Sequence, residues 1–260
     1  MHTATVPRTV TAYALRGSDL WTSSSAGLER WRVGGTAPEL VDAFDLQPYA
    51  DVVAANGALV AAARGNTVGL AVNDARLGWQ ATEPLSVCDE VVALYPAAQS
   101  VWVVGERHVS RVALTDAGPR VASTFELVAR EGSIYARPLA GPACGGAEAP
   151  EPVLAASASG NVLALALRRT VVTLDLEYPS RLPTFGAQAS GDDVTGITAR
   201  AGFVYATTTT APAGLIWRLG PRHPFVAVSA TPAPASIDGR QYSGRRAARL
   251  SGTVLTVAWW

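Results

Sequence analysis

The chain has 260 residues, a formal net charge of zero, 16% charged residues and 48% hydrophobic residues. High apolar content with little charge excludes a disordered chain. A zero net charge argues against nucleic-acid binding as a main task, because neutralising a phosphate backbone needs a cationic surface. All 21 basic residues are arginine, which excludes a lysine nucleophile, a lysine Schiff base and a P-loop.

Membrane and redox signals are weak. The N-terminal sequence MHTATVPR has no apolar signal core, and the chain has no run of 18 apolar residues, so we expect neither a signal peptide nor a membrane helix. Two cysteines, Cys88 and Cys144, are too few for a disulfide framework or a zinc site. We therefore expect two free thiols in a cytoplasmic protein.

A unit of roughly 40 residues recurs along the chain. Val10–Val33 and Val194–Leu219 both read as a strand, a Gly turn, a second strand, Gly-Leu, and a third strand ending near Trp-Arg. Repeats of this size made of four short strands are typical of a β-propeller. The sequence thus predicts an all-β fold, one propeller domain over residues 1–260, with six blades.

The predicted strands follow in chain order. In the first two repeats they are Thr9–Leu15, Leu20–Ser24, Gly27–Val33, Leu40–Phe44, Asp51–Ala55, Ala58–Ala63, Val68–Val72 and Leu77–Ala81. In the next three they are Glu90–Leu94, Val101–Val104, Val109–Leu114, Arg120–Phe125, Val153–Ser157, Val162–Leu167, Val171–Leu176, Val194–Thr198, Phe203–Thr207, Leu215–Leu219 and Phe225–Val228. Asn56-Gly57 predicts a hairpin turn, because both residue types accept positive φ. The bulky Trp21, Trp102 and Trp217 are expected to fill the core between blades.

The sixth repeat is short. It offers only Arg245–Leu250 and Thr253–Trp260 before the sequence ends. The N-terminal segment Thr3–Val6 can add a strand and close the ring, since an open ring exposes pairing edges. We expect a last blade of three strands, with a strand from another chain as the alternative.

Two connections are long, Glu131–Pro150 and Thr231–Ser243. Both are rich in loop-forming residues, and neither has helical periodicity. Each joins an outer strand to the next inner strand, so both are expected on the same face of the propeller.

Charged residues precede several predicted inner strands. In a propeller these positions surround the mouth of the central channel, where clustered carboxylates attract a cation, an amine or a basic peptide. The alternative is that they only cap turns and keep the rim soluble. The candidate binding residues are Asp51, Asp89, Glu90, Glu151, Asp192, Asp193 and Arg245, with Arg8 before the first inner strand.

Catalytic signals are absent from the sequence. His2, His108 and His223 stand in unrelated contexts, and no G-x-S-x-G elbow is present. Asp51, Glu90, Glu151 and Asp193 have the residue types of a calcium-dependent lactonase site, but nothing in their spacing requires one. We expect no cofactor, although a divalent cation at the mouth is compatible with these residues.

Two resemblances add to this interpretation. Leu20–Trp31 (LWTSSSAGLERW) resembles the repeat of two-component-regulator-type sensor propellers, and quinoprotein-like propellers look similar. An Ala- and Arg-rich propeller also looks like the propeller component of bacterial MoxR–von Willebrand A–propeller ternary systems. That second resemblance, made on architecture and composition, implies a bacterial protein that is a subunit of a larger complex.

The sequence therefore predicts a non-enzymatic scaffold that binds a protein or peptide through the loop-bearing face and the acidic mouth. The alternative is a metal-dependent hydrolase or lactonase at the same mouth. A third possibility is a fragment of a larger propeller protein whose partner domain carries the activity. Neither nucleic acid nor a membrane is an expected partner.

Overall fold

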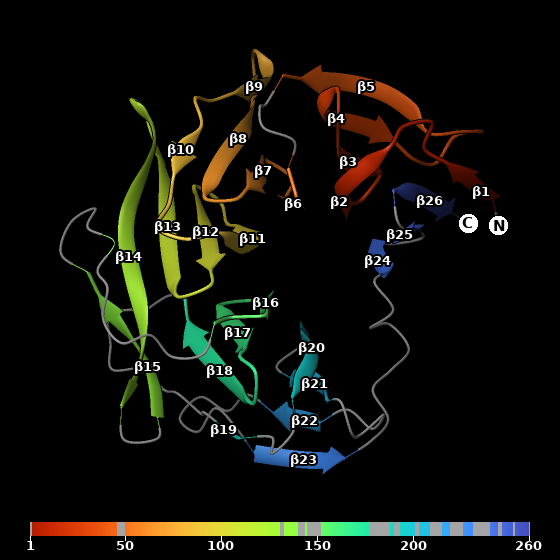
Figure 1. Ribbon diagram of the computed structural model, residues 1–260. Helices are drawn as coiled ribbons and strands as arrows, with labels where there is room; N and C mark the ends of the chain where they lie inside the picture. Colours follow the sequence, from red (N-terminus) through yellow and green to blue (C-terminus); the bar gives the residue numbers. More distant parts are fainter. Residues whose placement is uncertain are drawn as a thin grey trace. The chain divides into compact units, whose positions relative to one another are not determined.

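The structure of the chain is a computed structural model. It describes residues 2–45, 50–130, 133–139, 144, 152–176, 188–189, 193–200, 203–208, 215–218, 226–230, 240–243, 246–251 and 253–259. Within this part of the chain 26 strands form six antiparallel sheets, and no helix occurs (Figure 1). The all-β prediction is confirmed.

Sheets 1 and 2 follow the first two repeats. Sheet 1 has the order β2-β3-β4-β5, and sheet 2 has the order β10-β8-β7-β6 with β9 also paired to β8. Their strands are β2 (Val10–Arg16), β3 (Asp19–Ser24), β4 (Gly27–Arg32), β5 (Glu39–Phe44), β6 (Val52–Ala55), β7 (Leu59–Arg64), β8 (Thr67–Asp74), β9 (Gly78–Ala81) and β10 (Leu85–Ser86).

Sheets 3 and 4 cover the middle of the chain, in the orders β11-β12-β13-β14-β15 and β16-β17-β18-β19. The strands of sheet 3 are β11 (Val91–Pro96), β12 (Ser100–Gly105), β13 (His108–Thr115), β14 (Gly118–Arg130) and β15 (Ser133–Pro138). Those of sheet 4 are β16 (Ala155–Ser159), β17 (Val162–Ala166), β18 (Thr170–Asp175) and β19 (Gln188–Ala189).

Sheets 5 and 6 complete the set, in the orders β20-β21-β22-β23 and β1-β26-β25-β24. The strands of sheet 5 are β20 (Val194–Arg200), β21 (Phe203–Thr208), β22 (Leu215–Arg218) and β23 (Val226–Ala230). Those of sheet 6 are β1 (His2–Thr5), β24 (Arg240–Ser243), β25 (Arg246–Ser251) and β26 (Val254–Trp259).

Sheet 6 joins the two ends of the chain. His2 pairs with Trp259 and Thr5 with Thr256, so β1 lies beside β26 (Figure 1). The predicted N-terminal strap is confirmed. The expected three-stranded blade is wrong, because β24 adds a fourth strand from a segment interpreted as loop, and no strand from another chain is needed.

The long loops at 131–150 and 231–243 need the same correction. β15 lies within the first and pairs with the extended second half of β14, from Phe125 opposite Pro138 to Arg130 opposite Ser133. β24 lies within the second. Their composition suggested loop, but hairpin pairing of β15 with β14 and of β24 with β25 overrides weak local propensity.

Turn chemistry differs from the prediction at one hairpin. Gly57 does not have positive φ, and the Asn56 side chain closes the turn instead by accepting hydrogen bonds from the amides of Ala58 and Leu59, both at 2.8 Å. Gly27 does need to be glycine. Its φ is 99°, and a Cβ there would lie 2.3 Å from the carbonyl oxygen of Phe44.

The chain divides into two compact units, described separately. Unit 1 comprises Met1–Val103, Arg111–Ala122 and Asp238–Trp260, and unit 2 comprises Val104–Ser110 and Ser123–Ile237. The prediction of one domain over residues 1–260 stays a prediction.

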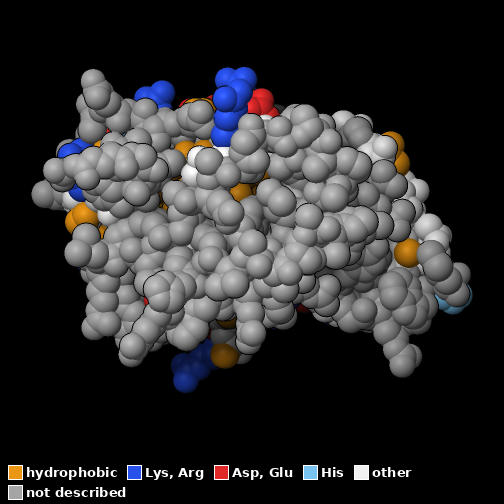
Figure 2. Space-filling view, turned by 90° about the horizontal axis from the view of Figure 1, so that it is seen from below, with side chains coloured by type: hydrophobic (Ala, Val, Ile, Leu, Met, Phe, Trp, Pro, Cys, Tyr) orange, Lys and Arg blue, Asp and Glu red, His pale blue; other side chains and the backbone are white. Residues whose placement is uncertain are grey.

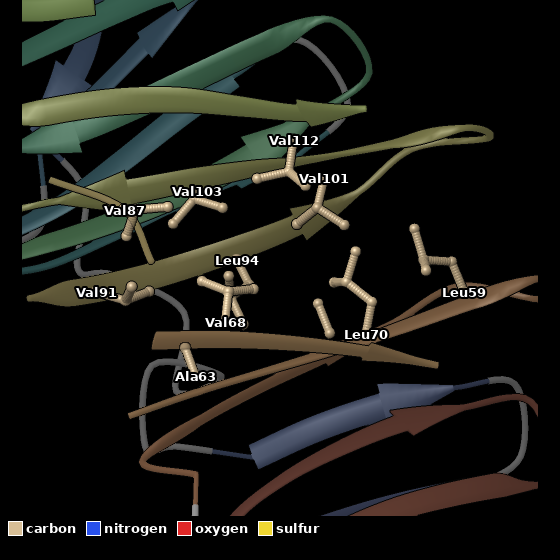
Figure 3. Packing of buried hydrophobic residues seen from close by; sticks show 11 residues of the cluster. Leu59, Ala63, Val68, Leu70, Val87, Val91, Leu94, Val101, Val103 and Val112 are labelled. Atoms are coloured by element: carbon tan, nitrogen blue, oxygen red, sulfur yellow. The ribbon is translucent and has the colours of Figure 1, made fainter. Parts of the chain in front are cut away.

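Apolar cores lie between neighbouring sheets inside each unit. In unit 1, Leu59, Val68 and Leu70 of sheet 2 face residues of β11, β12 and β13, among them Leu94 and Val101 (Figure 3). Other clusters join sheet 6 to sheet 1 and sheet 1 to sheet 2, and in unit 2 sheet 4 packs on sheet 5. Sheets of four or five strands stacked through their faces are the arrangement of propeller blades. Trp21 and Trp102 are buried, as predicted, whereas the side chain of Trp217 lies outside the described residues.

The cysteine prediction is wrong. Cys88 and Cys144, the two cysteines of the sequence, are both disulfide-bonded, and neither is a free thiol. Residue spacing carried no signal for disulfide bonding, since a disulfide depends on the distance between Cα atoms in the folded chain. No helix in the described part of the chain is long and apolar enough to cross a membrane.

Candidate functional site

The predicted site residues stand where the inner strands begin. The first strand of each repeat lies at one end of its sheet, and β6 contacts the first strands β2 and β11 of the neighbouring sheets. Asp51 precedes β6, Asp89 and Glu90 precede β11, and Asp193 precedes β20. Glu151, Asp192 and Arg245 lie outside the described residues.

A backbone hydrogen bond that occurs four times ties the start of an inner strand to the preceding repeat. The acceptor is a carbonyl in the turn between the second and third strands, called here the middle turn. The bonds run from Val91 N to Gly65 O at 2.7 Å, Val153 N to Glu106 O at 2.8 Å, Val194 N to Arg168 O at 2.7 Å, and Val10 N to Thr253 O at 3.0 Å. Glu90 and Asp193, each directly before such a valine, therefore lie beside a middle turn, which sequence order alone does not reveal.

Asp51 and Glu90 are brought to the same place. The amide of Asp51 donates to Ala63 O at 2.8 Å, and Val91, next to Glu90, donates to Gly65 O. The backbone of both residues thus lies at the end of β7. Both residues are exposed, and neither side chain has a hydrogen bond or ion pair with the described residues. Asp89, between Cys88 and Glu90, is half-buried.

Asp193 has a different environment. Its Oδ2 lies 3.2 Å from Arg168 Nε, and its Oδ1 lies 3.2 Å from Arg169 Nε. Hydrogen bonds from Arg169 and then Arg168 lower the pKa of the Asp193 carboxyl below its ordinary value. The carboxylate expected here at an acidic mouth is neutralised by two arginines of the middle turn.

Arg8, before the first inner strand, is also paired. Its Nε lies 3.3 Å from Oε1 of Glu29, whose side chain is 1% exposed. Ser24 Oγ donates to the other carboxylate oxygen of Glu29 at 3.4 Å. A second buried carboxylate, Glu126 on β14, pairs with Arg137 of β15. Sequence reasoning missed both; their signal in the sequence is a single acidic residue within each strand.

An arginine of sheet 1 lies beside two indoles that contact each other, with ring centroids 4.6 Å apart. The Arg30 guanidinium lies 5.9 Å from the Trp21 ring and 5.8 Å from the Trp79 ring, and its Nη2 lies 2.6 Å from Asp42 Oδ2. Cation–π contact and the ion pair fix Trp79 of sheet 2 against sheet 1. This supports Trp21 as core.

The histidines do not assemble a catalytic group. His2 is exposed on β1, His108 is buried on β13, and His223 lies outside the described residues. Near His108, the Ser110 and Thr124 hydroxyls lie 3.1 Å apart. Within the described ranges no three His, Cys, Asp or Glu side chains are grouped to hold a metal ion.

Apolar side chains do not form one docking patch on the part of the surface that the structure describes. The exposed large ones are Leu40, Leu77, Leu154 and Val254, which belong to different sheets and turns. On the face shown in Figure 2, the coloured hydrophobic side chains are scattered among arginines and carboxylates.

Comparisons with known proteins show the fold. No family model and no curated protein sequence matches the chain. A protein from Lactobacillus plantarum of known crystal structure matches with a TM-score of 0.59 and 14% identity, over 85% of this chain and 70% of that one.

A chain of the mitotic checkpoint complex matches with a TM-score of 0.51 and 11% identity, over 100% of this chain and 93% of that one. Sqt1 of Saccharomyces cerevisiae matches at 0.47 and 11%, over the full length of both. The similar structures are β-propeller proteins, which supports the predicted repeat fold. The resemblances to sensor propellers and to ternary-system propellers stay predictions.

Proposed function

We propose that this chain is a non-enzymatic six-bladed propeller that binds a basic segment of a protein partner through Asp51 and Glu90. The observation that carries the proposal is the placement of two exposed, unpartnered carboxylates beside the end of β7. An arginine or lysine side chain of a partner can form charge-assisted hydrogen bonds with both. Asp89 adds a third acidic residue to the same inner-strand start.

The similarity of the fold to that of a chain in a protein complex supports the proposed scaffold function. A chain of similar fold was solved in the mitotic checkpoint complex, so the fold occurs in a protein assembly. The metal-dependent hydrolase gains no specific observation, because the described residues hold no metal-ligand group. The expected cytoplasmic location stays a prediction. Free thiols no longer support this location, because both cysteines are disulfide-bonded. Disulfide bonds are rare in a reducing cytosol.

The experiment is affinity capture from the native cell extract with mass-spectrometric quantitation, comparing wild type with the double variant D51R/E90R. We expect wild type to enrich a partner with a basic surface and the variant to lose it about tenfold or more, since reversing two charges replaces attraction by repulsion. Capture should weaken with salt.

A matched control is E39R/D116R, which reverses two exposed carboxylates away from the inner-strand starts. Thermal unfolding of all three proteins checks that each is folded. Equal enrichment by D51R/E90R and wild type would refute Asp51 and Glu90 as the site.

A further inference from the structure

A short segment before β11 is held at both of its ends. Val87 donates its amide to Asn66 O at 2.9 Å, and the Val87 carbonyl accepts from Asn66 Nδ2 at 3.3 Å. Val91 donates its amide to Gly65 O at 2.7 Å. Both valines are buried and belong to one apolar cluster with residues of sheet 2 (Figure 3). The middle turn of sheet 2 therefore fixes the two ends of Val87–Val91.

The three residues between these ends are held differently. Asp89 and Glu90 carry no apolar side chain that burial could keep in place. Cys88 is disulfide-bonded, so a covalent bond restrains the backbone two residues before Glu90. Glu90 is exposed, and it is one of the two carboxylates to which the proposed function assigns partner binding. The disulfide bond thus restrains the segment that positions this carboxylate.

The disulfide-bonded cysteines are accessible to a reductant. Cys88 is half-buried, and Cys144, the other disulfide-bonded cysteine of the sequence, is exposed. Reduction needs attack of a thiolate on a disulfide sulfur, so exposed disulfides are the ones open to redox regulation. A dithiol supplies two electrons and two protons: the S–S bond breaks, two cysteine thiols form, and the dithiol closes to its own disulfide.

From these contacts we propose that the disulfide bond of Cys88 is a redox switch that regulates binding at Glu90. The inference rests on the proposed function, because it adds regulation to the same site. With the bond intact, the backbone around Glu90 is already ordered when a partner arrives. After reduction by a dithiol, the two valines keep their places in the core, while the three residues between them gain freedom that binding must remove again. Ordering side chains at an interface costs affinity, so the reduced protein binds more weakly.

The first test is backbone NMR relaxation of the full chain before and after dithiothreitol, with reduction checked by iodoacetamide labelling. The amides of Asp89 and Glu90 are expected to have order parameters of about 0.85 in the oxidised protein and below about 0.6 in the reduced protein. Asp193 is the matched control, because Val194 after it makes the same 2.7 Å bond to a middle turn and no cysteine is near it in the sequence.

The Asp193 amide should not change on reduction. Unchanged order parameters at Asp89 and Glu90, or failure of dithiothreitol to reduce the folded protein, would overturn the inference. An unfolded spectrum after reduction would also overturn it, because the switch is local.

The second test is calorimetric titration with a hexa-arginine peptide. Oxidised wild type is expected to bind about twofold to tenfold more tightly than reduced wild type, the range for ordering one interface side chain. C88S/C144S, whose fold the same spectrum checks, should bind like the reduced protein and ignore dithiothreitol. Equal binding by the oxidised and reduced forms, including none, would overturn the regulation. Binding that D51R/E90R does not weaken would instead count against the proposed function, and the relaxation data would still show whether the bond orders Glu90.

Discussion

Two inner-strand starts in this chain share their local structure and differ in their electrostatics. Glu90 and Asp193 each precede a valine whose amide donates to the preceding middle turn at 2.7 Å. Glu90 has no side-chain partner, although Arg64 ends the neighbouring β7, whereas Asp193 lies between Arg168 and Arg169. The charge of such a site is therefore set by two segments from adjacent repeats, and the acidic residue alone does not determine it.

Arg8 extends the comparison to a buried pair. It stands before the first inner strand, but its partner Glu29 is 1% exposed. Near three inner-strand starts, Glu90 is therefore without a partner among the described residues, Asp193 is in an exposed ion pair, and Arg8 is in an ion pair whose other member is buried. The two ion pairs differ in the cost of losing one partner. A buried charge without a partner lowers the free energy of unfolding far more than an exposed one, because it is desolvated.

The largest effect is expected from R8A. The variant leaves the Glu29 carboxylate buried without its cation, and we expect a loss of about 3 kcal/mol in the free energy of unfolding. Urea denaturation followed by tryptophan fluorescence measures it. The double variant R8A/E29Q should recover part of the loss. A cost of less than about 0.5 kcal/mol, as for a surface pair, would show that burial does not distinguish this position.

The next effect is a difference in partner capture between variants at Asp193 and variants at Asp51 and Glu90. D193R should keep partner capture within about twofold of wild type, because the site is already neutralised by arginines, while D51R/E90R should lose about tenfold or more. The same affinity capture and mass spectrometry quantify both. Equal losses in the two variants would mean that Asp51, Glu90 and Asp193 act as one site.

A smaller effect is expected in the pH dependence of stability. The folded-state pKa of Asp193 is lowered by Arg169 and Arg168, so its contribution is present above the ordinary carboxyl pKa and is lost as pH falls through the lowered value. The difference in melting temperature between wild type and D193N should therefore shrink below pH 3.8. A difference in melting temperature that stays constant as the pH falls through this range would contradict the stabilisation of the Asp193 carboxylate by Arg169 and Arg168.

The smallest effect is expected from metal ions. Calcium, manganese and zinc should each leave the melting temperature unchanged within about 1 °C, because a ligand that binds only the folded state must raise it. Differential scanning fluorimetry with and without EDTA measures this. A saturable stabilisation lost in D51N/E90Q would revive the hydrolase alternative at these two residues.

Most of the fold follows from local patterns in the sequence. Alternating apolar residues bounded by Gly and Asn turns located nearly every strand of the first two repeats, because side-chain alternation and turn chemistry are properties of a few consecutive residues. The same holds for the charged residue before each inner strand. β15 and β24 escaped because their segments carry Pro, Gly and polar residues that locally resemble loops, and their pairing partners stabilise them.

By itself, then, the sequence determined the repeat, the strands and the position of Asp51, Glu90 and Asp193 before inner strands. The tertiary structure decided which of these carboxylates remain unpaired. Arg168 reaches Asp193 across 25 positions of sequence and Arg8 reaches Glu29 across a strand pair. Both cysteines became disulfide-bonded in the same way. Charge neutralisation and disulfide formation depend on distances between remote segments, and those distances exist only once the sheets have packed.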